Sequence, residues 1–104
     1  MNSAKRVVIT GFGGITALGH DWPTIESALR ANKSGIARMH EWDRYTDLNT
    51  RLGGPVPQFT LPPHYTRKVT RTMGRVALLA TRATEMALED AGLLGDPVVS
   101  SGAM

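Results

Sequence analysis

The 104-residue sequence contains no cysteine, so this chain can form no disulfide and offers no thiolate to a metal ion or to a covalent intermediate. Aromatic residues are also scarce, at 6% of the chain. No run approaches the roughly 18 apolar residues of a membrane-spanning helix, and the first residues lack an apolar stretch of signal-peptide length. We therefore expect a cytoplasmic location and no membrane partner. The 41% hydrophobic and 20% charged content is typical of a globular chain.

The charge is positive overall, with a formal net charge of +3. Five basic residues fall within sixteen positions: Arg67, Lys68, Arg71, Arg75 and Arg82. Such a local excess favours an acidic partner. The cluster lacks interleaved aromatic residues and matches no named nucleic-acid motif, so we do not expect nucleic acid to be that partner.

The strongest strand pattern is Val7-Val8-Ile9, which has no polar face and predicts a strand buried on both sides in an α/β sheet. A glycine-rich turn follows. Its Gly11-x-Gly13 begins like a dinucleotide fingerprint, but Thr16 stands at the third small position and the next helix start is at Asp21. A nucleotide-binding α/β fragment remains an alternative. The simpler interpretation is that these glycines let the backbone turn sharply and pack closely, so we predict no cofactor.

Two helices are predicted. Asp21 is a plausible N-cap with Pro23 in the first turn, and an apolar stripe that includes Trp22 and Ala28 follows. This helix should end near residues 31–32. Residues 64–92 hold the longer helix, with an alanine-rich apolar face and Gly92 as its stop.

The remaining segments carry weaker patterns. Residues 36–63 read as an irregular loop, with a short edge strand within residues 51–56. Val98-Val99 suggests the start of a further strand. A loop this long argues against a compact independent domain.

Several segments match one family in order and at the expected spacings. They are Thr10 to Gly19, Lys33-Ser34-Gly35-Ile36, Thr70 to Arg75, and Ala87 to Leu93. The chain resembles the amino-terminal opening of β-ketoacyl-[acyl carrier protein] synthases of the elongating type, with Asn32 in place of the usual glycine. The resemblance implies an α/β fold: the amino-terminal portion of a thiolase-like layered fold, with buried strand, glycine-rich turn, helix, irregular loop and long helix. Residues 1–104 would be a segment of the synthase domain rather than a complete one.

The resemblance implies that the full-length protein is an acyltransferase and a homodimer, which condenses malonyl-carrier protein with an acyl chain in fatty acid or polyketide synthesis. The family's catalytic cysteine and its assisting residues lie downstream of this segment. His20, His40 and His64 match none of them. We therefore assign no catalytic residue and no metal ligand, and expect this chain alone to be inactive. A non-catalytic subunit that binds carrier protein or a synthase is the alternative.

One functional site is implied within the segment. In the resembled family, basic residues before and at the start of the long helix dock the acidic acyl carrier protein. Lys68 and Arg71 match that pattern, and Arg67 is also basic. Thr72 stands where a second lysine is common, which weakens the match. A solvated helix start whose charges only confer solubility is the alternative for these residues.

Overall fold

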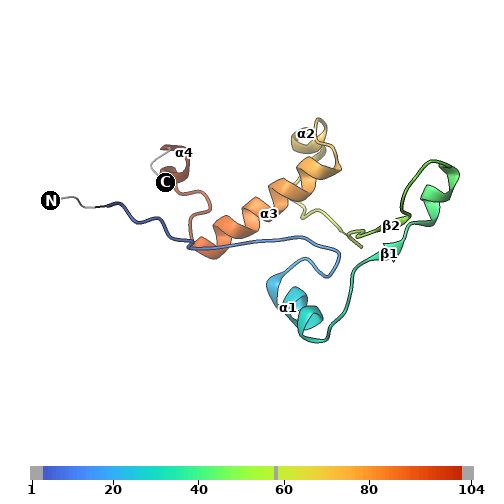
Figure 1. The fold of residues 1–104 in the computed structure, drawn as a ribbon. Helices are drawn as coiled ribbons and strands as arrows, with labels where there is room; N and C mark the ends of the chain where they lie inside the picture. The colour runs from blue at the N-terminus through green and yellow to red at the C-terminus, as the bar shows by residue number, and fades with distance from the viewer. Residues whose placement is uncertain (1–3, 58, 102–104) are drawn as a thin grey trace. The chain divides into compact units, whose positions relative to one another are not determined.

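The computed structural model describes residues 4–57 and 59–101, which form two compact units. One unit contains residues 4–13 and 72–101, and the other contains residues 14–71 apart from residue 58. The first unit holds helices α3 (Arg75–Ala91) and α4 (Pro97–Ser101), drawn in orange and red in Figure 1. The second holds, in chain order, α1 (Trp22–Arg30), β1 (Ala37–Arg38), the 3-10 helix η1 (His40–Arg44), β2 (Leu52–Gly53) and α2 (Arg67–Thr70).

Helix α1 begins and ends where local chemistry predicts. The carboxylate of Asp21 accepts a 2.8 Å hydrogen bond from the backbone N–H of Thr24, and a proline occupies the first turn. Glu26 and Arg30 form an ion pair one turn apart, at 2.9 Å, in the favourable order of acidic before basic residue. The predicted N-cap, proline position and C-terminal boundary are confirmed. Ala28 is the one buried hydrophobic residue among those the structure describes.

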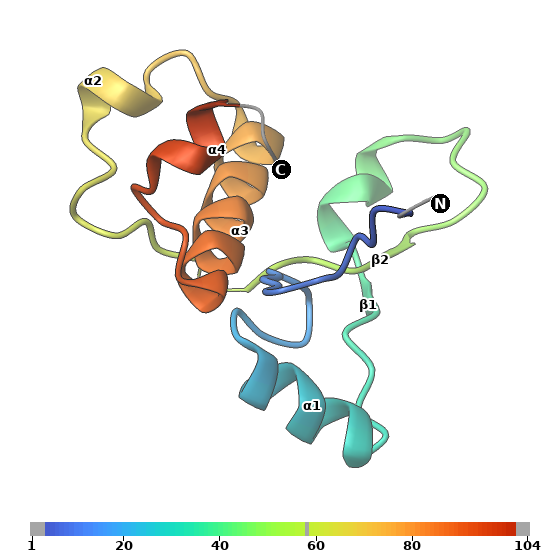
Figure 2. The same cartoon turned by 90° about the vertical axis from the view of Figure 1, so that its left-hand side faces the viewer.

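The loop between α1 and α2 is more ordered than expected, because it contains a small antiparallel hairpin (Figure 2). Strand β2 confirms the predicted edge strand, whereas β1 and η1 were not predicted. Asp43 on η1 joins β1 to the residue before β2, with its carboxylate 2.7 Å from Arg38 and 3.2 Å from Arg51. The hairpin thus depends on a side chain of its own connection, a contact that no period in the sequence reveals.

Helix α3 is the long helix of the sequence prediction. It ends at Gly92, whose φ of 73° is a left-handed conformation that glycine adopts without steric cost. Arg82 and Glu85 form an ion pair three residues apart on this helix. The helical region is divided, however, since α2 is a separate single turn and residues 71–74 interrupt the helix before Arg75.

Residues 4–13 form an extended segment of the same unit (Figure 1), and its last residues, Gly11 to Gly13, lie against α3. A Cβ at Gly11 would lie 2.6 Å from the carbonyl oxygen of Ala87, and one at Gly13 would lie 2.5 Å from that of Ala83. These glycines therefore let the backbone approach the alanine face of α3, which confirms the close-packing interpretation. The alanines supply the small side chains that the approach requires.

The prediction of a doubly buried strand is wrong for the chain as the structure describes it. Val7 and Ile9 are 96% and 88% exposed, and residues 4–10 form no strand. A strand needs a neighbour to complete its backbone hydrogen bonds, and the described residues offer none to this segment. The strand predicted from Val98-Val99 is also wrong, since those residues lie in α4. There, the Asp96 carboxylate accepts a 2.9 Å hydrogen bond from the N–H of Val98 and Pro97 opens the helix, so capping outweighs β-propensity.

Within residues 4–57 and 59–101, no helix is long and apolar enough to cross a bilayer.

Candidate docking surface on helix α2

The candidate site is the single turn α2, which follows the proline-rich end of the irregular loop. Thr66 precedes the helix in an extended conformation. The hydroxyl of Thr70 returns a 3.1 Å hydrogen bond to the carbonyl of Thr66, and the N–H of Arg71 donates to the carbonyl of Arg67 at 2.9 Å. These bonds close one complete turn and fix the spacing of the residues on it.

The turn brings the three sequence-predicted docking residues to one side. Arg67 and Arg71 are four positions apart, so they lie one above the other on the helix surface. Lys68 follows Arg67 by about 100° around the axis, which keeps the three charges within one arc. All three residues are exposed. We call Arg67, Lys68 and Arg71 the α2 basic face.

No acidic side chain within the described residues neutralises this face. Among the described residues, ion pairs join Glu26 to Arg30, Asp43 to Arg38 and Arg51, and Glu85 to Arg82, and none includes a residue of the α2 basic face. Like charges four residues apart on a helix are destabilising by roughly 0.2–0.5 kcal/mol. The α2 basic face therefore costs the fold a small amount of stability, and its charges stay available to an acidic partner.

The structure refines which basic residues belong together. Arg82 is paired with Glu85 and is partly buried, so it does not extend the basic face. Arg75 opens α3 in the other unit. Arg67 and Lys68 lie on their own short turn and not at the start of the long helix. Their positive charges are therefore not opposed by the dipole of α3.

The other candidate chemistry does not assemble. His20 packs edge-on against Phe59 at 5.8 Å between ring centroids, and His64 packs against Tyr65 at 4.8 Å. His40 is exposed at the start of η1. Among residues 4–57 and 59–101, no three His, Asp or Glu side chains gather in a way that could hold a metal ion. The turn at Gly11 and Gly13 is filled by α3, and the following helix starts only at Trp22.

Comparison with known families gives a match over nearly the whole chain. Residues 4–103 match the family model described as beta-ketoacyl synthase, N-terminal domain. Among curated proteins, the chain is 38% identical over 96 residues to 3-oxoacyl-[acyl-carrier-protein] synthase 1 of Haemophilus influenzae, covering 90% of this chain and 23% of that protein. It is 39% identical over 93 residues to nodulation protein E of Rhizobium sp., covering 88% of this chain and 22% of that protein.

A solved structure agrees with the sequence matches. The crystal structure of a beta-ketoacyl synthase from Burkholderia phymatum superposes with a TM-score of 0.84 at 52% identity, covering 94% of this chain and 24% of that one. The thiolase-like α/β fold class is thereby confirmed. The chain spans about a quarter of the length of these relatives.

Proposed function

Because the chain belongs to the beta-ketoacyl synthase family and matches its N-terminal domain, we propose that it is the amino-terminal segment of a 3-oxoacyl-[acyl-carrier-protein] synthase and docks the carrier protein through the α2 basic face. The complete protein would condense malonyl-carrier protein with an acyl chain and would act as a homodimer. Residues outside this segment would supply the catalytic groups. The relatives named as 3-oxoacyl-[acyl-carrier-protein] synthases support this reaction class.

One observation carries the docking proposal. Arg67, Lys68 and Arg71 lie on one exposed turn, and no carboxylate within the described residues neutralises them. A surface of this kind attracts an acidic protein over a distance of about 10 Å at moderate ionic strength. Such charges speed the encounter and set its orientation more than they add affinity. The proposed role is therefore electrostatic guidance of the carrier protein.

The test is the association rate of the full-length protein with its carrier protein, measured by stopped-flow fluorescence at low and high salt. Changing Lys68 to Glu and Arg71 to Glu together should lower the association rate constant by about tenfold at low salt and much less at high salt. The matched control changes Lys5 and Arg6 to Glu. These two residues are also exposed and basic but lie outside α2.

The two variants separate a local effect from a general one. If both double variants slow association equally, the effect is that of net charge and the α2 basic face is not the docking surface. If neither slows it, carrier-protein docking through this segment is wrong. Circular dichroism of both variants checks that the fold is retained.

A further inference from the structure

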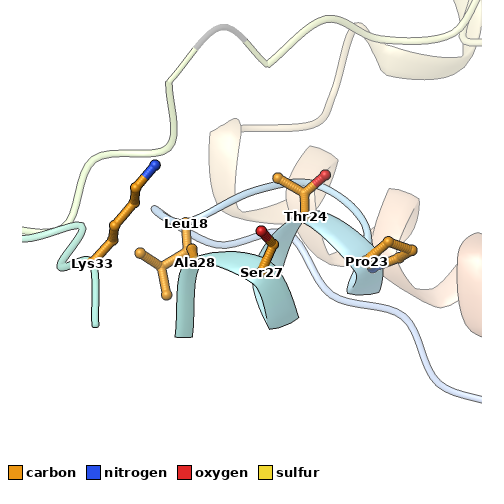
Figure 3. Close-up of a pocket in the computed structure, with 6 residues that line it drawn as sticks. All are labelled: Leu18, Pro23, Thr24, Ser27, Ala28 and Lys33. Atoms are coloured by element: carbon orange, nitrogen blue, oxygen red, sulfur yellow. The ribbon is translucent and has the colours of Figure 1, made fainter. Parts of the chain in front are cut away.

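A groove on α1 lies outside the α2 basic face and has no role in the proposed function. It has a volume of about 440 Å³ and is shown in Figure 3. Its lining combines apolar and polar side chains: Leu18, Pro23, Thr24, Ser27, Ala28 and Lys33. All of them lie in the unit of residues 14–71, so the groove is complete within that unit.

The end of α1 positions the lysine of this groove. Asn32 adopts a left-handed conformation with a φ of 56°, which reverses the chain after the helix. The N–H of Lys33 then donates a 2.9 Å hydrogen bond back to the carbonyl of Ala28, and the N–H of Asn32 donates to the carbonyl of Leu29 at 3.1 Å. The backbone of Lys33 is thus fixed beside the helix whose hydroxyl residues line the same groove.

Two polar groups of the groove are not used by the fold. Within the described residues, the ammonium group of Lys33 forms no ion pair and the hydroxyl of Ser27 forms no hydrogen bond with another residue, whereas the side chain of Thr24 is hydrogen-bonded to Asp21. Figure 3 shows the lysine side chain and both hydroxyls on the same side of the α1 ribbon. One cation and one hydroxyl donor, those of Lys33 and Ser27, therefore border one groove and remain free to bind a ligand.

The apolar residues complete the chemical description. Leu18, Pro23 and Ala28 give the groove a hydrophobic part beside its polar edge. We propose that the groove binds a small carboxylate with a short aliphatic chain. Lys33 and the Ser27 hydroxyl would hold the two carboxylate oxygens, and the aliphatic chain would lie on the apolar side chains. A single cation matches the single charge of a carboxylate better than the two charges of a phosphate monoester.

The test follows the three lysines of this segment: Lys5, Lys33 and Lys68. The amines of the full-length protein are dimethylated with ¹³C, which keeps their charge, and the three resonances are assigned among those of the whole protein with the variants Lys5→Arg, Lys33→Arg and Lys68→Arg. Titration with hexanoate should move the Lys33 resonance in a saturable way. Lys5 and Lys68 serve as internal controls and should not move.

Three further titrations test each part of the groove. Hexan-1-ol lacks the charge and acetate lacks the chain, so each should bind at least tenfold more weakly than hexanoate. Ser27→Ala should weaken hexanoate binding by about threefold to tenfold, as expected for one lost hydrogen bond. Amide spectra of the variant check that α1 is intact.

Several outcomes would overturn the proposal. They are a Lys33 resonance that does not respond to hexanoate, parallel movement of all three lysines, equal response to acetate, or a stronger response to inorganic phosphate. The same labelled sample tests this proposal and the proposed function separately. Carrier protein should move the resonance of Lys68, and hexanoate should move that of Lys33, so either result can fail without the other.

Discussion

The backbone N–H of Phe12 donates a 3.1 Å hydrogen bond to Oδ2 of Asp90, 78 positions further along the chain. The bond ties the glycine-rich segment to the last turn of α3. The helix dipole disfavours a carboxylate near the C-terminus of a helix, so Asp90 does not stabilise α3 by its charge. Its role is to hold the extended segment against the helix.

Replacing Asp90 by alanine should therefore free the segment of residues 4–13. We expect a loss of about 1 kcal/mol in the free energy of unfolding, because the bond is exposed and partly replaced by water. Asp90→Asn keeps an acceptor oxygen and removes the unfavourable charge, so its loss should be smaller. Hydrogen exchange at the Phe12 amide measures the effect directly. Asp47→Ala, at an exposed position, is the control.

If the Phe12 amide exchanges at the same rate in Asp90→Ala as in the wild type, the bond does not hold the segment. A faster exchange in Asp90→Ala and in Asp47→Ala alike would point to a general effect of charge instead.

Gly13 and Gly14 are adjacent in the sequence, but we expect replacement by alanine to affect stability very differently at the two positions. A Cβ at Gly13 would lie 2.5 Å from the carbonyl oxygen of Ala83 and 2.8 Å from the backbone nitrogen of Ala87, both rigid helix atoms. Gly13→Ala should cost about 1–3 kcal/mol of stability, the range for overpacking. Gly14 has open space around its Cβ position and no positive φ, so Gly14→Ala should change stability by about 0.5 kcal/mol or less.

Urea denaturation of the two variants provides the comparison. Equal stabilities would show that the extended segment moves away from α3 at little cost, and that the small face of the helix is not required.

Local chemistry made part of this fold predictable. The helix caps at Asp21 and Gly92, and the ion pairs between residues three and four apart, form between neighbours within one helical turn. Such features can therefore be predicted from the sequence alone. The strand at Val7 to Ile9 depends on partners far away in sequence, and local pattern says nothing of whether they are present. The ion pairs of Asp43 with Arg38 and Arg51 are closer in sequence, but they lie in a loop without periodicity, so no pattern predicts them.

The candidate site was predictable to a different degree. Arg67, Lys68 and Arg71 were found through the family resemblance, because a run of basic residues alone does not name a partner. The division between α2 and α3 was missed. Helical spacing continues through residues 71–74, and the break is visible only in the backbone. The groove at Lys33 was missed because Asn32, which turns the chain, reads as an ordinary helix end.

The N-cap of α1 predicts a pH dependence. The hydrogen bond from the Thr24 N–H holds the pKa of Asp21 below its ordinary value of 3.8. A carboxyl group with a lowered pKa in the folded state adds stability above its unfolded pKa, and that stability is lost as the pH falls through the folded value. Asp21→Asn keeps a capping oxygen but does not titrate.

The wild type should thus be the more stable protein at pH 7, and its advantage over Asp21→Asn should shrink as the pH falls below about 4. Urea denaturation at several pH values measures this difference. Asp47→Asn controls for the titration of an exposed carboxylate. A difference between wild type and Asp21→Asn that does not vary with pH would contradict the capping role.

The exposed segment Val7 to Ile9 predicts how the 104-residue chain behaves by itself. Its side chains face solvent and the backbone of residues 4–10 makes no hydrogen bond within the described residues, so it resembles an unprotected edge strand. We expect the isolated chain to be marginally stable and to associate through this segment as its concentration rises.

Ile9→Lys should suppress the association, because a charge on an edge strand opposes pairing with another chain. Val76→Lys is the matched control: Val76 is 82% exposed, but it lies in the helix α3 and not in an extended segment. Light scattering coupled to size-exclusion chromatography distinguishes the two. Equal suppression by both variants would assign the association to exposed apolar area in general, and a monomer at every concentration would show that the segment needs no partner.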